Sequence, residues 1–176
     1  MVGGSGNEID PIDKYWEKYH WAIPYAEAED KTNPIPATPY RQYLPTDPSH
    51  PRAFIPNYVR WAKRYLAGFR CLITGWHETD YFQDIDGRGP IRLVGRLTAD
   101  HKLPGSLGGL TTDENIQMIS CFANTKKGNS GITNEELTER LLKTHKKLEL
   151  PEDLKQSLQK YNITIYRVGN ATLRFR

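Results

Sequence analysis

The sequence predicts an α+β fold, and three observations lead to this prediction. Apolar residues recur with helical spacing after Pro56, and helix-start signals stand at Thr133 and Pro151. Between these helices, residues 70–99 read as two short β segments around the Gly- and Asp-rich turn 84–90. The length of 176 residues suits one domain with a small extension.

Residues 1–55 are predicted to form an N-terminal arm that is acidic, aromatic and rich in proline. An aromatic stretch over 8–30 is expected to include a short helix, and residues 33–56 hold seven prolines. Proline fixes φ and lacks an N–H donor, so this segment cannot form a long helix or a central strand. We therefore expect an extended arm that wraps the body or a partner.

The helix that Pro56 opens is predicted to have one apolar face and one basic face. The opposite side from the apolar face carries Arg60, Lys63 and Arg64, which are candidate phosphate contacts. Charged residues opposite an apolar stripe are also typical of a solvated surface, and both interpretations stay open. The apolar face is expected to consist of Tyr58, Trp61, Ala62, Tyr65, Leu66 and Phe69.

The middle of the chain is predicted to form a strand, a Gly-rich loop and a helix. The predicted strand Ile91–Ala99 alternates polar and apolar side chains, with Arg92 and Arg96 on its polar face. After the loop, the predicted helix runs from an N-cap at Thr112 to a stop at Gly128. Its buried stripe is expected to consist of Ile116, Ile119, Phe122 and Ala123.

The C-terminal region, residues 131–176, is predicted to add two helices and a β-hairpin to a central core at 56–130. The first helix begins with the capping box Thr133-x-x-Glu136, and the second begins at Pro151. The hairpin is expected over residues 163–175, around a Gly-Asn turn. The first helix is expected to bury Leu137, Leu141 and Leu148.

The charge distribution favours a polyanionic partner. The net charge is +3, but residues 1–50 carry 4 Lys/Arg and 8 Asp/Glu, whereas residues 51–176 carry 20 and 13. A basic body with an acidic arm suits nucleic acid, although an ordinary mixed-charge surface would show a similar balance. No stretch approaches the roughly 18–20 consecutive apolar residues of a membrane helix, so we expect no membrane partner.

The predicted strand, loop and helix that end at Lys127 contain the chemical groups that phosphodiester hydrolysis requires. Asp100 supplies a hard oxygen ligand of the kind that Mg²⁺ or Mn²⁺ prefers, and Asn124 adds a neutral oxygen ligand. His101, neutral near pH 7, is a candidate general base that takes a proton from water. Lys127 follows Asn124 by one helical turn, where its charge is placed to hold a phosphate.

Four ordered motifs resemble those of the HNH endonucleases. They are Cys71-Leu-Ile-Thr-Gly75, Ala99-Asp100-His101-Lys-Leu-Pro104, Gly108-Gly109-x-Thr-x-x-Glu114-Asn115 and Asn124-x-x-Lys127-Gly128. The resemblance implies a ββα-metal fold, in which two antiparallel strands pack on one helix with a single divalent ion between them. Without this context, His101 would read as an ordinary strand-end histidine satisfied by Asp100.

The resemblance also implies roles for individual residues. By position, His101 resembles the general base, and Asp100 and Asn124 resemble the metal ligands. Asn115 resembles the asparagine that braces the loop bearing the base. Asn115 and Asn124 are nine residues apart, about 180° around the predicted helix, so we expect bracing and ligation to fall to different residues. The set is similar to the form found in phage and CRISPR-effector nucleases.

The two cysteines depart from the zinc-binding relatives of that family. Those relatives hold a structural Zn²⁺ on two Cys-x-x-Cys pairs, whereas Cys71 is followed by Thr74 at the partner position. We expect no structural zinc, and a mixed site that uses His77 is the alternative. Cys71 and Cys121 are then expected to be small buried residues of an intracellular protein, from a bacterium or a phage-infected host.

The leading hypothesis is a Mg²⁺- or Mn²⁺-dependent DNA endonuclease, acting on double-stranded DNA in a restriction, homing or phage-type role. One such site attacks one strand, so a homodimer would be needed to cut both strands at once. Two alternatives stay open: a DNA-binding protein that keeps the fold without cutting, and an RNA nuclease. The candidate DNA contacts are Arg60, Lys63, Arg64, Arg92, Arg96, Lys102 and Lys126.

Overall fold

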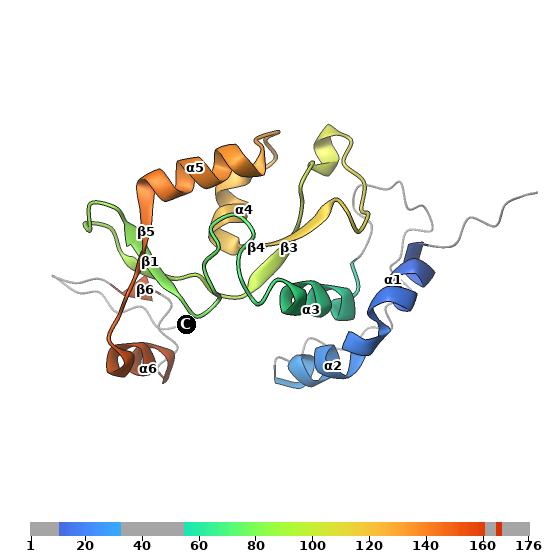
Figure 1. Cartoon of the computed structure of the whole chain (residues 1–176), viewed down its shortest axis with the longest axis horizontal. Helices are drawn as coiled ribbons and strands as arrows, with labels where there is room; N and C mark the ends of the chain where they lie inside the picture. Colours follow the sequence, from blue (N-terminus) through green and yellow to red (C-terminus); the bar gives the residue numbers. More distant parts are fainter. Residues whose placement is uncertain (1–10, 33–54, 161–164, 167–176) are drawn as a thin grey trace, which may run out of the picture.

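The computed structural model describes residues 11–32, 55–160 and 165–166. Two antiparallel sheets lie within a set of surrounding helices (Figure 1), and the predicted α+β class is confirmed. One sheet has the strand order β5-β1-β2-β6, and the other consists of β3 and β4. The Pro-rich segment 33–54 and most of the predicted C-terminal hairpin lie outside the described residues.

The four-stranded sheet joins the middle of the chain to its C-terminal part. Its core brings Tyr81 and Ile91 against Leu158 of α6 (Glu152–Lys160), the helix predicted to begin at Pro151. Every neighbouring pair in the sheet is antiparallel. The strands are β1 (Tyr81–Asp84), β2 (Ile91–Leu93), β5 (His145–Leu148) and β6 (Ile165–Tyr166).

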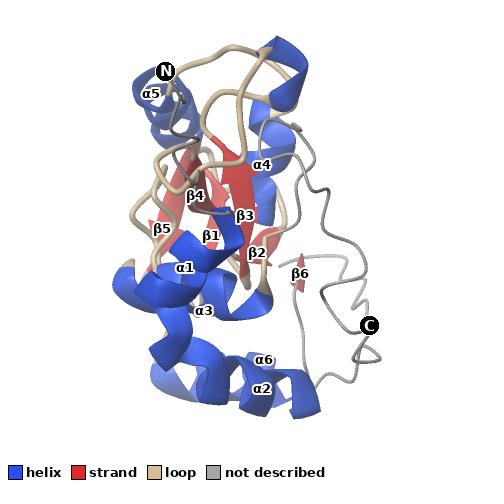
Figure 2. Ribbon diagram, turned by 90° about the vertical axis from the view of Figure 1, so that its right-hand side faces the viewer, coloured by secondary structure: helices blue, strands red, loops and turns tan. Residues whose placement is uncertain are grey.

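The two-stranded sheet and the helix after it form the centre of the molecule (Figure 2). β3 (Leu97–His101) pairs antiparallel with β4 (Ile116–Ser120). The helix α4 (Cys121–Lys127) begins directly after β4 and contacts both strands. In the loop between the strands, one 3₁₀ turn spans Gly105–Leu107.

The prediction of one continuous helix between Thr112 and Gly128 is wrong in its first half. Residues 116–120 form β4, all five of them buried, and the N-cap of the helix is Ser120, whose side chain accepts a hydrogen bond from the Ala123 N–H. A short apolar run has the same hydrophobicity in a buried strand as in a buried helix, so its periodicity does not separate the two. Pairing with β3 decides the conformation.

The predicted strand Ile91–Ala99 is also interrupted. β2 ends at Leu93, and β3 begins at Leu97 in the other sheet. Between them, Gly95 has a φ of +72°, a left-handed conformation that glycine adopts without steric cost. The break gives the strand that ends at Asp100-His101 a partner different from that of β2.

The N-terminal helices pack on α3 (Asn57–Leu66), which begins after Pro56 as predicted. The predicted apolar face is only partly correct, because Val59 and Ala62 are buried whereas Tyr65 and Leu66 are 52% and 64% exposed. The helices that cover α3 are α1 (Pro11–Tyr19), the 3₁₀ turn η1 (His20–Ala22) and α2 (Ile23–Thr32). The aromatic stretch therefore holds more helix than the short one predicted.

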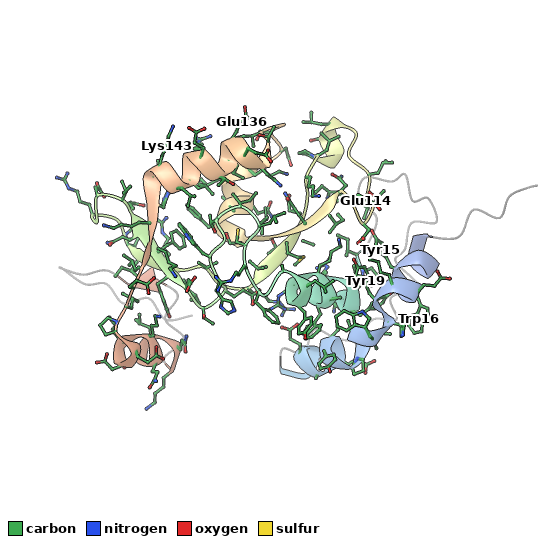
Figure 3. The ribbon with its side chains drawn as sticks, in the orientation of Figure 1. Tyr15, Trp16, Tyr19, Glu114, Glu136 and Lys143 are labelled. Carbon is green, nitrogen blue, oxygen red and sulfur yellow. The ribbon has the colours of Figure 1, made fainter. Side chains whose placement is uncertain are left out.

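The helix α5 (Asn134–Thr144) confirms the predicted capping box. The Thr133 side chain accepts from the Glu136 N–H, and the Glu136 carboxylate accepts from the Thr133 N–H. Glu136 and Lys143 lie on its outer side (Figure 3), whereas Leu137 and Leu141 are buried as predicted. Leu148 belongs instead to β5, because the chain leaves the helix to pair with β1.

Asp113 anchors α1 and α3 to the loop before β4. Its carboxylate accepts a hydrogen bond from the Tyr19 hydroxyl (2.9 Å) and forms ion pairs with Lys18 and Lys63. Figure 3 shows Tyr15 and Tyr19 of α1 on the side of this loop. Burial alone would raise the pKa of Asp113, but hydrogen bonds from Lys18, Lys63 and Tyr19 lower it from 3.8 to about 2.

We expect Asp113→Asn to destabilise the protein in a pH-dependent manner. A carboxylate whose pKa is lower in the folded state stabilises the fold above its unfolded pKa, and it loses this effect as the pH falls from about 4 to about 2. The expected loss is about 2 kcal/mol at pH 7. Urea unfolding of both proteins at pH 7 and pH 2 measures it. An equal difference at both pH values would contradict the role of the charge.

Within the described ranges, no helix combines the length and the apolar character that crossing a lipid bilayer requires.

Candidate functional site

The C-terminal end of β3 carries Asp100 and His101. The Asp100 side chain is 11% exposed, and its Oδ2 atom lies 3.0 Å from Lys127 Nζ and accepts a hydrogen bond from Gln117 Nε2 at 2.9 Å. In the part of the chain that the structure describes, no donor lies on the other carboxylate oxygen, Oδ1. That oxygen is therefore the one available to a metal ion.

The His101 imidazole is half-buried and contacts a side chain of the loop before β4. Its Nε2 atom lies 2.8 Å from the hydroxyl oxygen of Thr111, a buried residue in the loop before β4. Burial lowers the pKa of His101 below its ordinary value of 6.5, and the charge of Lys127 lowers it further, while Asp100 opposes both. The lowered pKa favours the neutral form of the imidazole, the form that accepts a proton.

Asn115 holds together the two ends of the loop that connects β3 and β4. Its Oδ1 atom accepts from the Leu103 N–H at 2.9 Å, and its Nδ2 atom donates to the carbonyls of Leu103 and Leu110 at 3.1 and 2.8 Å. Glycine is required at position 109, since a Cβ atom there would stand 1.8 Å from the Leu103 carbonyl oxygen. The amide thus closes the loop immediately beyond His101.

Lys127 is placed differently from the phosphate contact predicted for it. The residue is 2% exposed, and its ammonium donates to the His101 carbonyl and forms the ion pair with Asp100. A cation so enclosed is not accessible to a phosphate group outside the site. Its contacts instead join α4 to the end of β3.

Asn124 lies three residues before Lys127 in α4, so the two side chains share one face of the helix. Because the Lys127 ammonium reaches the Asp100 carboxylate, this face is directed towards the end of β3. Asn124 is half-buried, and its side chain has no hydrogen-bond partner within the described ranges. Asn115 precedes β4 rather than sharing a helix with Asn124, so the predicted 180° relation between them does not apply.

The metal-ligating residue types do not cluster within the part of the chain that the structure describes. Among residues 11–32, 55–160 and 165–166, no three His, Cys, Asp or Glu side chains form a group that could hold a metal ion. A site made of one carboxylate and one carboxamide is not a group of that kind. Cys71 is buried as predicted, but Cys121 is exposed at the start of α4, which corrects the prediction that both are buried.

The predicted DNA contacts divide into buried and accessible groups. Arg64 is 5% exposed and forms ion pairs with Glu29 and Glu78, and Lys63 is held by Asp113 and by the Ile116 carbonyl. These two side chains stabilise the fold and are not available to DNA, because their charges are already paired within the protein. The more accessible side chains are those of Arg60, Arg92, Arg96, Lys102 and Lys126.

Of these accessible cations, Arg96 pairs with Glu29 at 3.2 Å, and Arg60 donates to the Ile55 carbonyl. Arg92 and Lys126 both lie over the ring of Phe122. Lys102 follows His101 directly and is exposed, which makes it the predicted cation nearest in sequence to the site.

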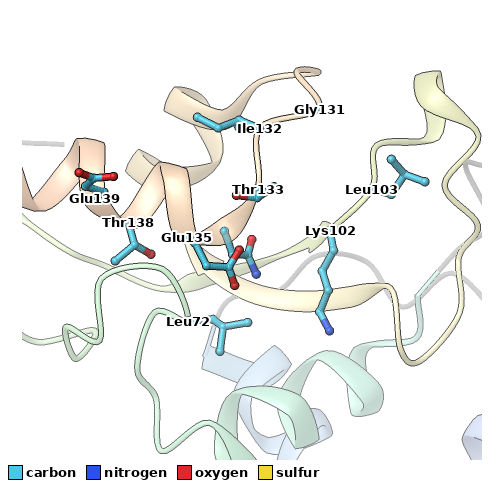
Figure 4. Close-up of a pocket in the computed structure, with 10 residues that line it drawn as sticks. Leu72, Lys102, Leu103, Gly131, Ile132, Thr133, Glu135, Thr138 and Glu139 are labelled. Atoms are coloured by element: carbon cyan, nitrogen blue, oxygen red, sulfur yellow. The ribbon is translucent and has the colours of Figure 1, made fainter.

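A groove of about 880 Å³ borders the site (Figure 4). Lys102 and Leu103 line it on one side, and the start of α5 lines it on the other, with Leu72 between them. Asn134, the first residue of α5, lines the groove and pairs with the Gln117 amide, at 2.8 and 3.2 Å. The groove is thus connected through Gln117 to Asp100.

Three residues of this network escaped sequence reasoning: Thr111, Gln117 and Asn134. Each is an ordinary polar residue with no motif of its own. Recognising 116–120 as a strand opposite 97–101 would have placed Gln117 across from Asp100, because cross-strand neighbours share a face. No local signal identifies Thr111 or Asn134.

Comparisons with family models, curated proteins and solved structures found no match to this chain. A function therefore has to be inferred from the geometry around Asp100 and His101.

Proposed function

We propose that this protein is a metal-dependent DNA endonuclease of the HNH type, which hydrolyses phosphodiester bonds. The observation that carries the proposal is the end of β3, where a carboxylate with one unoccupied oxygen adjoins a neutral imidazole. The Asp100 carboxylate pairs with Lys127 of α4, the helix that also bears the Asn124 carboxamide. The order of β3, β4 and α4, two antiparallel strands followed by a helix, supports the proposal.

The donor set fits a hard divalent cation such as Mg²⁺ or Mn²⁺. Asp100 Oδ1 and the Asn124 carboxamide oxygen would hold it, and such ions usually take the rest of their ligands from water and phosphate. When bound, the ion would neutralise the charge that develops on the phosphate and on the departing 3′ oxygen. The two oxygens come from different elements, so folding of α4 against β3 completes the site.

His101 is the proposed general base. In the tautomer that carries the proton on Nε2, this atom donates to the Thr111 hydroxyl, and Nδ1 carries the lone pair that accepts a proton from the attacking water. The water oxygen forms the new bond to phosphorus while the bond to the 3′ oxygen breaks, and the 3′ oxygen takes a proton from solvent. The products carry a 5′-phosphate and a 3′-hydroxyl.

Asn115 and Lys127 are proposed to orient this centre rather than to touch the substrate. Asn115 closes the loop beyond His101, and Lys127 fixes the Asp100 carboxylate and the His101 carbonyl. We propose that the accessible cations contact the DNA backbone. Lys102 is the first candidate, because it directly follows His101, the proposed general base. A restriction, homing or phage-type role, and a homodimer that cuts both strands, belong to the same proposal.

Incubation of supercoiled plasmid with the full chain tests the function. We expect nicked or linear products with Mg²⁺ or Mn²⁺, none with EDTA, and none from Asp100→Ala. The matched control is Asp86→Ala, an exposed aspartate in the turn after β1, which should cut like the wild type. Plasmid that migrates more slowly in a gel with the protein, but stays uncut under every metal condition, would indicate the non-cleaving DNA-binding alternative. Selective cutting of RNA would indicate the RNA nuclease.

A further inference from the structure

We propose that Gln117 and Asn134 are positioning residues that aim the Asp100 carboxylate at the metal ion. This inference rests on the proposed nuclease function, because it assigns Asp100 as a ligand. It adds two residues that the sequence motifs do not contain. It also makes α5, a helix outside the strand–strand–helix core, part of the site.

Gln117 holds the Asp100 carboxylate from the neighbouring strand, β4. Gln117 lies directly opposite Asp100 in the register of the two strands and is 3% exposed. Its Nε2 atom and the Lys127 ammonium both contact Oδ2 of Asp100, at 2.9 and 3.0 Å. The hydrogen bond and the ion pair on this one oxygen restrain rotation of the carboxylate, and within the described ranges they leave Oδ1 as the oxygen with no hydrogen-bond donor.

Asn134 of α5 in turn pairs with the Gln117 amide. Asn134 Nδ2 donates to Gln117 Oε1 at 2.8 Å, and Gln117 Nε2 donates to Asn134 Oδ1 at 3.2 Å. This reciprocal contact holds the plane of the Gln117 amide, and the charge of Asp100 favours its Nε2 end over its carbonyl end. Without Asn134 the amide is less constrained, and its Nε2 atom would hold the carboxylate less firmly.

Gln117 is a polar residue within a buried strand. All five residues of β4 are buried, and a buried carboxamide is costly unless its donors and acceptor are paired. Both polar atoms of the Gln117 side chain are used, and among the described residues their partners are Asp100 and Asn134. An apolar side chain would fill the same space, so we attribute the glutamine to its contact with Asp100.

Mn²⁺ binding by the full chain in the absence of DNA tests the inference. We expect Gln117→Met and Asn134→Ala each to weaken Mn²⁺ binding about 10- to 100-fold, the range for residues that orient a metal ligand. The Mn²⁺ concentration for half-maximal plasmid cleavage should rise by the same factor. The matched control is Gln83→Met. Gln83 is a half-buried glutamine on β1 whose side chain donates to the carbonyls of Gly87 and Gly89 in the following turn, so its replacement should change neither value.

The outcomes separate this inference from the nuclease proposal. Wild-type Mn²⁺ affinity in folded Gln117→Met would overturn the positioning role, while cleavage by the wild type would leave the nuclease function intact. If Gln117→Met does not fold, Asn134→Ala decides in the same way, because Asn134 is half-buried at the start of a capped helix. A wild type that neither binds Mn²⁺ nor cuts would overturn the nuclease proposal itself.

Discussion

Replacing His101 with alanine is expected to slow plasmid cleavage by about 10²- to 10⁴-fold, the usual contribution of a general base. The expectation follows from an imidazole that burial keeps neutral and that Thr111 orients through Nε2. Because His101 is not a proposed metal ligand, the variant should keep the Mn²⁺ affinity and the DNA affinity of the wild type. Single-turnover cleavage at saturating Mn²⁺ measures the chemical step.

The control for this variant is His77→Ala. His77 is half-buried in the loop before β1, where its Nδ1 atom contacts the Thr79 hydroxyl, and we give it no part in cleavage. It should cut at the wild-type rate. Undiminished cleavage by His101→Ala would remove this residue from the mechanism, even if metal dependence were confirmed.

Replacing Arg64 with methionine is expected to lower the free energy of unfolding by about 3 kcal/mol, near the lower end of the range for breaking a buried ion pair. The guanidinium donates two hydrogen bonds to Glu78 and two to Glu29, at 2.7–2.9 Å. The variant would leave both carboxylates without this cation. The melting temperature should fall by about 6–12 °C, as expected for a chain of this size.

Arg70→Met is the matched control for Arg64. Arg70 is exposed and its side chain donates to the Gly75 carbonyl, so its replacement should change the stability by less than about 1 kcal/mol. Thermal unfolding and DNA binding are measured on both variants. An Arg64→Met protein with wild-type stability but weakened DNA binding would restore the phosphate contact that the sequence suggested.

Several features of this protein could be predicted from short stretches of sequence. The α+β class, the start of α3 after Pro56 and the capping box at Thr133 depend on residues within one or two helical turns. The same holds for the adjacency of Asp100 and His101 and for the shared helix face of Asn124 and Lys127. Such features can be predicted because they depend on local backbone geometry, which nearby residues determine.

Other features required the packed structure. Residues 116–120 are apolar in either conformation, and pairing with β3 makes them a strand. Arg64 has the same charge whether solvated or buried, and its burial depends on Glu29 and Glu78, which are 35 and 14 residues away in the chain. Lys127 is enclosed because α4 packs against the end of β3.

The candidate site shows the same division. Its chemistry-bearing residues stand in recognisable motifs, but the orientation of Asp100 comes from Gln117 and Asn134, which belong to a neighbouring strand and to α5. Thr111 likewise reaches His101 across a loop. Spacing along the chain indicates which groups a segment offers. Which atoms those groups present depends on partners brought together by folding, and short-range sequence patterns carry no record of such long-range contacts.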